Sequence, residues 1–165
     1  MIERREPDFV LPERELLDAW LEYHRATLRW KCEGLSDEQL KLRSVPPSTM
    51  SLLGLVRHMA DVERNWFRRV LDGQVAPGIF WSDDNEEGEF DDVDDADVAS
   101  NWATYEAEVA EAQRITAGMQ LDDTGTRRGK PCSVRWVYTH MIEEYARHNG
   151  HADLLRQCID GATGD

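Results

Sequence analysis

Apolar residues recur along this chain at steps of three and four, the spacing of a helix that buries one face. Four stretches show the pattern, and we expect helices over residues 12–33, 51–71, 96–119 and 134–159. In the first, the expected buried face is Leu16, Trp20, Tyr23, Thr27 and Trp30. No convincing alternation with a period of two appears, so we expect no strands. Amphipathic helices of this length predict an all-α four-helix bundle.

The connections between these helices differ in length. Ser36 and Gln39 form a capping-box pattern, which predicts a short turn of helix after the first long one. A long acidic loop, from about Gly73 to Asp95, is expected between the second and third helices. Its acidic residues lack the spacing of a calcium-binding loop, so a solvated segment is the favoured interpretation.

The length of 165 residues fits a single domain over 1–165 with its own core. There is no run of about 18 apolar residues to span a membrane. The amino-terminal segment lacks the apolar core of a secretory signal, so we expect a cytoplasmic protein that does not bind membranes. A net charge of −14 repels phosphate backbones, which argues against nucleic acid as a partner. Three scattered cysteines favour free thiols over disulfides.

Polar residues interrupt the apolar face of the fourth helix. His140, Glu144, His148 and His151 fall within about 80° on a helical wheel, and Glu144 and His148 lie inside the apolar stripe. A buried carboxylate costs several kcal/mol unless an ion pair or a bound cation satisfies it. Glu144 and His148 are four residues apart and can reach one ion together, and His58 is the best third ligand. The alternative is a hydrogen-bonded Glu–His pair that serves only the structure.

Two imidazoles and one carboxylate form a ligand set of catalytic zinc, which leaves a fourth position for water or substrate. The same set suits iron, nickel or manganese, so we expect a divalent cation with zinc as the first choice. His140 and His151 flank the ligands. They are expected either to orient the ligands or to act as catalytic acid and base.

Two segments resemble the DinB/YfiT-like metal-binding four-helix bundles: SLLGLVRHMADVERNWFRRVLDG and VRWVYTHMIEEYARHNGHADLLR. In that family one metal ligand lies on the second helix and two, four residues apart, lie on the last. By position, the resemblance implies His58, Glu144 and His148 as ligands. Many members have histidine in place of Glu144, and the carboxylate is similar to the metal domain of mycothiol-dependent maleylpyruvate isomerase. The isomerase has a second domain that this sequence lacks, so the wider class of thiol transfer is the expectation.

The resemblance implies a metal-dependent thiol S-transferase, in which a low-molecular-weight thiol such as mycothiol attacks an electrophilic substrate. His140 or His151 would accept the thiol proton. Trp66, Tyr145 and aromatic residues of the loop would form an apolar wall around the electrophile. Two alternatives stay open: a metal-dependent hydrolase, and a non-catalytic, stress-related protein that binds metal or a small molecule. Related bundles often pair, which leaves a homodimer open.

Overall fold

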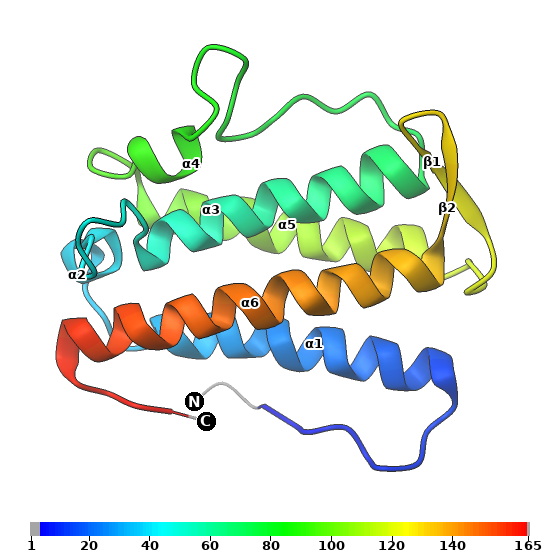
Figure 1. Cartoon of the computed structure of the whole chain (residues 1–165), viewed down its shortest axis with the longest axis horizontal. Coiled ribbons are helices and arrows are strands. Elements are labelled where there is room, and N and C mark those ends of the chain that lie inside the picture. Colours follow the sequence, from blue (N-terminus) through cyan, green and yellow to red (C-terminus); the bar gives the residue numbers. More distant parts are fainter. Residues whose placement is uncertain (1–3, 165) are drawn as a thin grey trace.

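The computed structural model describes residues 4–164 as a bundle of long helices with a short hairpin at one end (Figure 1). The ends of the predicted domain, residues 1–3 and 165, lie outside this range. The long helices are α1 (Glu13–Cys32), α3 (Leu52–Glu63) continued by η1 (Arg64–Leu71), α5 (Val98–Thr116) and α6 (Val134–Asp160). α1 packs along α6, and α3 packs along α5. The predicted helical bundle is confirmed.

The ends of the helices follow local sequence signals. The Ser133 hydroxyl accepts a hydrogen bond from the Trp136 backbone N–H at 3.2 Å, which caps the start of α6. α6 ends at Gly161, whose φ of 78° is the left-handed conformation that favours glycine. The predicted capping box of Ser36 and Gln39 is present at the start of the short helix α2 (Asp37–Lys41).

α1 buries a different face from the one expected. Of the residues predicted to be buried there, only Thr27 is fully buried, whereas Leu21, Arg25, Leu28 and Cys32 lie in the core. The aromatic residues predicted for this face are half-buried at its edge. Large rings with a polar tip suit such a border position, because one end stays in contact with water.

The second long helix changes its geometry halfway. α3 is α-helical, and η1 continues it as a π-helix, a rare form that is often found at functional sites. Arg64 and Arg68 on η1 donate hydrogen bonds at 2.7 and 2.6 Å to Glu108 on α5, whose side chain is 3% exposed. These ion pairs hold the π-helix η1 against α5. The sequence predicted a single uniform helix here.

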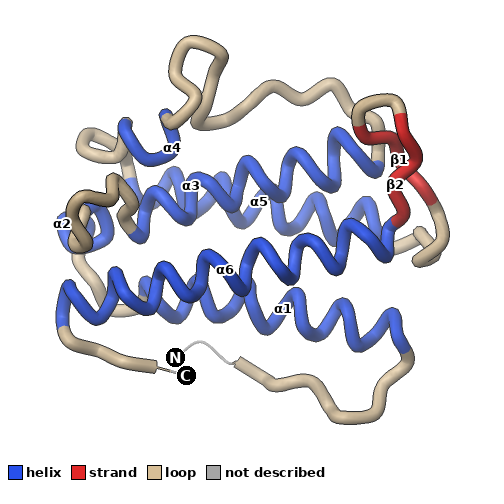
Figure 2. Tube along the Cα trace, in the orientation of Figure 1, coloured by secondary structure: helices blue, strands red, loops and turns tan. Residues whose placement is uncertain are grey.

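A two-stranded hairpin joins α5 to α6, so the expectation of no strands was wrong (Figure 2). β1 (Thr124–Arg127) pairs with β2 (Lys130–Ser133) in antiparallel register. Arg128 and Gly129 between them have φ values of 50° and 76°. Two central residues with positive φ make the tight turn that matches the twist of a hairpin.

The hairpin is anchored to the bundle at both ends. The Val134 N–H donates to the Asp123 carbonyl at 2.9 Å, which closes the base of the hairpin. On the other side, β1 lies against η1 so closely that a Cβ on Gly125 would come 1.9 Å from the Val70 carbonyl oxygen. Glycine at position 125 is therefore required by packing. The hairpin and the π-helix therefore pack against each other at this end of the molecule.

The long connection between η1 and α5 is only partly the solvated loop that was expected. Most of its acidic residues are exposed, but it contains a short helix, α4 (Gly88–Asp91), in which Glu89 and Phe90 are buried. Asp61 on α3 holds an earlier part of the connection by accepting backbone hydrogen bonds from Ile79 and Phe80 at 2.7 and 2.9 Å. Within residues 4–164, no helix is both long enough and apolar enough to cross a membrane.

Candidate metal centre

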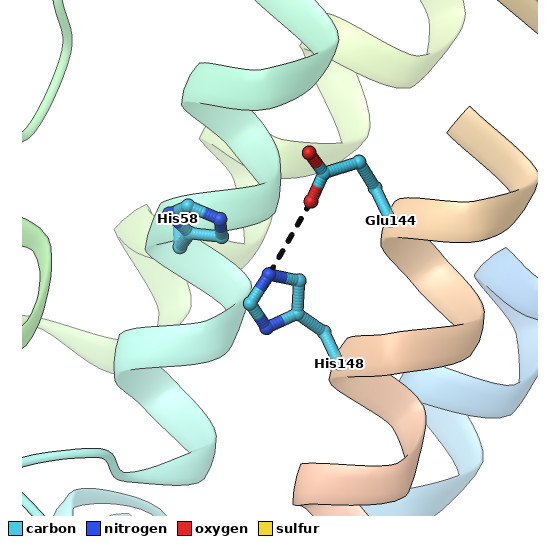
Figure 3. A group of neighbouring side chains, drawn as sticks. All are labelled: His58, Glu144 and His148. Atoms are coloured by element: carbon cyan, nitrogen blue, oxygen red, sulfur yellow. Dashed lines mark ion pairs between the residues drawn. The ribbon is translucent and has the colours of Figure 1, made fainter. Parts of the chain in front are cut away.

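Three predicted residues converge between α3 and α6 (Figure 3). His58 comes from α3, Glu144 and His148 come from successive turns of α6, and one donor atom of each lies within 4.8 Å of the other two. His148 Nε2 is 3.5 Å from Glu144 Oε2. Two ligands on a tetrahedral ion with bonds of about 2.0–2.1 Å are roughly 3.3 Å apart. The donor types and their spacing therefore fit one divalent cation.

Each imidazole of this group is held by its other nitrogen. His58 Nδ1 lies 3.2 Å from Glu89 Oε1, which leaves Nε2 to face the centre. His148 Nδ1 lies 3.4 Å from His151 Nδ1, which leaves Nε2 on the side of Glu144. Such outer contacts fix the tautomer and the ring orientation of metal-binding histidines. Both rings are therefore prepared to offer Nε2 as a ligand.

The electrostatics of the group keep its carboxylate charged. The hydrogen bond with His148 lowers the pKa of Glu144 against the opposing effect of burial, and the nearby charges of His140, His148 and His58 lower it further. His140 Nε2 lies 3.2 Å from the second carboxylate oxygen, Oε1. Glu144 is thus ionised at neutral pH, the state in which a carboxylate binds metal.

A second group, made of His140, Glu143 and Glu144, also has donor atoms within 4.8 Å of one another. It suits a cation less well. His140 approaches Glu143 through Nδ1, at 3.8 Å, and Glu144 through Nε2, at 3.2 Å, which are opposite sides of the ring. Glu143 is also exposed, whereas all members of the first group are partly buried. The arrangement around His58 is therefore the better candidate.

His140 and His151, the predicted catalytic residues, lie on either side of the ligand group. The His140 ring stacks on Trp136, with centroids 5.0 Å apart, and meets the edge of Trp66 at 4.5 Å. His151 contacts His148, and burial lowers its pKa, as do the charges of His148 and Arg147. The structure thus brings both histidines to the group.

A buried polar network in the core of the bundle was not predicted. Arg25 on α1 donates hydrogen bonds at 2.8 and 2.6 Å to the two oxygens of Glu63 on α3. Tyr145 on α6 donates to Glu63 at 2.7 Å, and its hydroxyl is 2.9 Å from that of Tyr105 on α5. The expectation that Tyr145 lines a substrate wall was wrong, because its side chain is fully buried in this network. The network ties all the long helices together, and its member Tyr145 follows Glu144 in the sequence.

An open cleft of about 740 Å³ adjoins His140, and its volume is typical of small-molecule sites. Trp66, predicted as a wall residue, lines it together with Trp136 and the basic side chains of the hairpin. The hairpin residues were missed because no strand was expected there. Glu89 was missed because it lies within a run of acidic residues that composition alone describes as solvated. The sequence did contain one sign that Glu89 is buried, because the adjacent Phe90 is a large apolar side chain that favours a buried position.

Together, the fold and the site define a helical-bundle protein with a candidate metal centre beside an open cleft. A family model described as mycothiol-S-transferase matches residues 16–161. The chain therefore belongs to the mycothiol-S-transferase family, and the predicted resemblance is confirmed. A comparison with curated proteins gives no match.

Family membership decides among the activities considered from the sequence. The chain is a transferase, and the activity of its family is metal-dependent transfer of the thiol mycothiol to electrophiles. The predictions of a transferase and of mycothiol as cosubstrate are confirmed at the level of the family.

Proposed function

We propose that His58, Glu144 and His148 bind one divalent cation, with zinc as the first choice and nickel, iron or manganese as alternatives, and that mycothiol reacts at this site. The observation that supports this is the convergence of three donor atoms from two helices within 4.8 Å. A cation with three protein ligands keeps a position open for a thiol, lowers its pKa and keeps the sulfur nucleophilic at neutral pH.

The surrounding residues hold the ligands and handle the proton. Glu89 and His151 orient the two ligand imidazoles through their Nδ1 atoms. The proton that the thiol releases passes to His140 or to His151. Burial lowers the pKa of His151, which favours the neutral imidazole, the form that can accept a proton. His140 borders the cleft, the side from which the second substrate enters.

Metal analysis tests the ligand set. Protein purified without added metal should contain about one divalent ion per chain, and Glu144→Ala should lose it. Glu143→Ala is the matched control, because Glu143 is adjacent in sequence, exposed, and a member only of the second group. His58→Ala should lose the ion, whereas His24→Ala, on α1 outside the group, should keep it. Retention in His58→Ala with loss in Glu143→Ala would place the ion in the second group.

An activity assay tests the reaction. Mycothiol and chlorodinitrobenzene should react quickly with the metal-loaded enzyme, slowly after chelation, and quickly again after the metal is restored. His140→Ala should keep the metal but lower kcat. His151→Ala should lower kcat and also weaken metal binding, because it removes the contact at His148 Nδ1. Equal rates with and without metal would refute the proposed mechanism.

A further inference from the structure

The cleft beside His140 contains a cluster of positive charge in a strongly acidic protein. The chain has 33 acidic and 19 basic residues. The hairpin, residues 124–133, reverses this balance, with three basic residues and no acidic one. All three, Arg127, Arg128 and Lys130, line the cleft. A net charge of −14 repels anions in general, so this cluster changes the local field at one place.

These cations are available to a ligand. Among the residues that the structure describes, none of the three forms an ion pair with a carboxylate. Arg135, only a few residues further along the chain, is by contrast paired with both Glu13 and Asp122. Acidic residues are abundant elsewhere in the chain. The lack of carboxylate partners for the hairpin cations is therefore specific to this cleft.

Aromatic rings fix the position of the charge and extend the cleft toward the candidate metal centre. The Arg127 guanidinium lies 3.9 Å from the centroid of the Trp66 ring, a cation–π contact. Trp66 lies 5.1 Å from Trp136, and both contact His140. Trp136 is 49% exposed, so part of its ring faces solvent and can stack on a planar ligand.

The cleft and the metal centre share a residue. His140 lines the cleft, and its Nε2 is 3.2 Å from Glu144. Trp136, His140, Glu144 and His148 follow each other at four-residue steps on one face of α6, which advances about 6 Å per step. A small molecule that reaches from the centre along this face therefore meets His140, then the Trp136 indole, and then the cations.

We propose that the electrophilic substrate is a planar, apolar molecule with an acidic group, and that Arg127, Arg128 and Lys130 bind this group while Trp136 stacks on the planar part. The inference rests on the proposed function, because it names the second substrate of the same site. The thiolate sulfur forms a bond to the electrophilic carbon, the leaving group departs with the electron pair of its bond, and the thiol proton is released to the protein and then to water. The acidic group takes no part in bond making; it places the reacting carbon beside the sulfur.

A matched pair of substrates tests the proposal. We compare chlorodinitrobenzoate, whose carboxylate is para to the chlorine, with the neutral carboxamide of the same compound. For each compound, the enzymatic rate is divided by the rate of its uncatalysed reaction with mycothiol. Charge-assisted hydrogen bonds of about 1.5–3 kcal/mol correspond to about 10- to 100-fold in kcat/KM. We expect the acid to be preferred by this factor, and the preference to fall as salt is added.

Variants locate the effect. Arg127→Gln/Lys130→Gln should lower kcat/KM for the acid about 10- to 100-fold and leave that for the amide within about twofold. Arg135→Gln, a cation outside the cleft, should change neither. An equal loss for both substrates would overturn the proposal. So would a rise in the KM for mycothiol with no change in the acid–amide preference, since the cations would then bind the thiol cosubstrate.

Binding without reaction separates this proposal from the proposed function. Dinitrobenzoate has no leaving group, and its affinity is measured by calorimetry on wild-type protein, on Glu144→Ala and on the double cleft variant. We expect weaker binding by at least about tenfold in the cleft variant, and binding close to that of wild type in Glu144→Ala. Retained binding in Glu144→Ala supports the cleft even if the metal mechanism fails. Equal affinities for dinitrobenzoate and its neutral amide would refute the anion site whatever the metal does.

Discussion

Replacing Arg25 by methionine should destabilise the bundle strongly, because the change leaves a carboxylate alone in the core. Glu63 is 0% exposed and takes two hydrogen bonds from Arg25, at 2.8 and 2.6 Å. In Arg25→Met, Glu63 would keep only the hydrogen bond from Tyr145 at 2.7 Å. Neither water nor another cation of this network would compensate its charge.

The magnitude follows from the burial. Removal of one partner of a buried ion pair costs about 3–5 kcal/mol. In a chain of this size 1 kcal/mol corresponds to about 2–4 °C, so Tm should fall by roughly 6–20 °C. Arg25→Met combined with Glu63→Leu removes both charges at similar total volume and should recover most of the loss. In that variant Tyr145 still has the Tyr105 hydroxyl, 2.9 Å away, as a partner.

Equilibrium unfolding in urea of the wild type, both single variants and the double variant gives the coupling free energy of the pair. Arg29→Met is the control, since it removes an exposed ion pair with Glu106 and should cost less than about 1 kcal/mol. Two results would refute the reasoning. One is a loss of unfolding free energy in Arg25→Met that is no larger than the loss in Arg29→Met. The other is a loss of unfolding free energy in the double variant that equals the sum of the losses in the two single variants.

Three further predictions concern other parts of the molecule. Glu89→Ala should weaken metal binding about 10- to 100-fold in a competition titration with a chelator, with recovery in Glu89→Gln, which keeps an acceptor oxygen; unchanged affinity in the alanine variant would contradict the orienting role. Gly125→Ala should lower the free energy of unfolding by about 1–3 kcal/mol, since its Cβ would clash with η1, whereas Gly118→Ala has open space around it and serves as control. Burial raises the pKa of Cys32 to about 12, so a thiol reagent should label the exposed Cys158 in the folded protein and Cys32 only on unfolding; equal labelling rates would contradict this.

Much of the fold was predictable because helix signals are local. The apolar spacing and the caps gave α5 and α6 within a few residues, and Glu144 with His148 stood out because two polar side chains at one level of an apolar stripe need a common partner. Arg25 carried the same signal, between Leu21 and Leu28 on one face, but its partner lies on another helix. A contact between two helices cannot be read from the wheel of one of them.

The hairpin was not predictable by the same means. Its strands are short and carry little apolar alternation, and what holds β1 in place is the close approach of Gly125 to η1, a contact between segments far apart in the sequence. A local sign did exist in Arg128-Gly129, since a residue followed by glycine can adopt the two positive φ values of a tight hairpin turn. The cytoplasmic location stays a prediction, and the homodimer that the sequence left open would be tested by sedimentation of the purified protein.

Because backbone hydrogen bonds and one tightly packed glycine anchor the hairpin, most of its side chains can change without disturbing the bundle. In the proposed mechanism the helices carry the chemistry of sulfur activation, while the proposed binding face for the second substrate lies on a short, separately anchored element. Grafting other residues at Arg127, Arg128 and Lys130 should therefore redirect the enzyme to neutral or cationic electrophiles. Protein engineers could use this division to build a set of thiol-transfer catalysts on one scaffold.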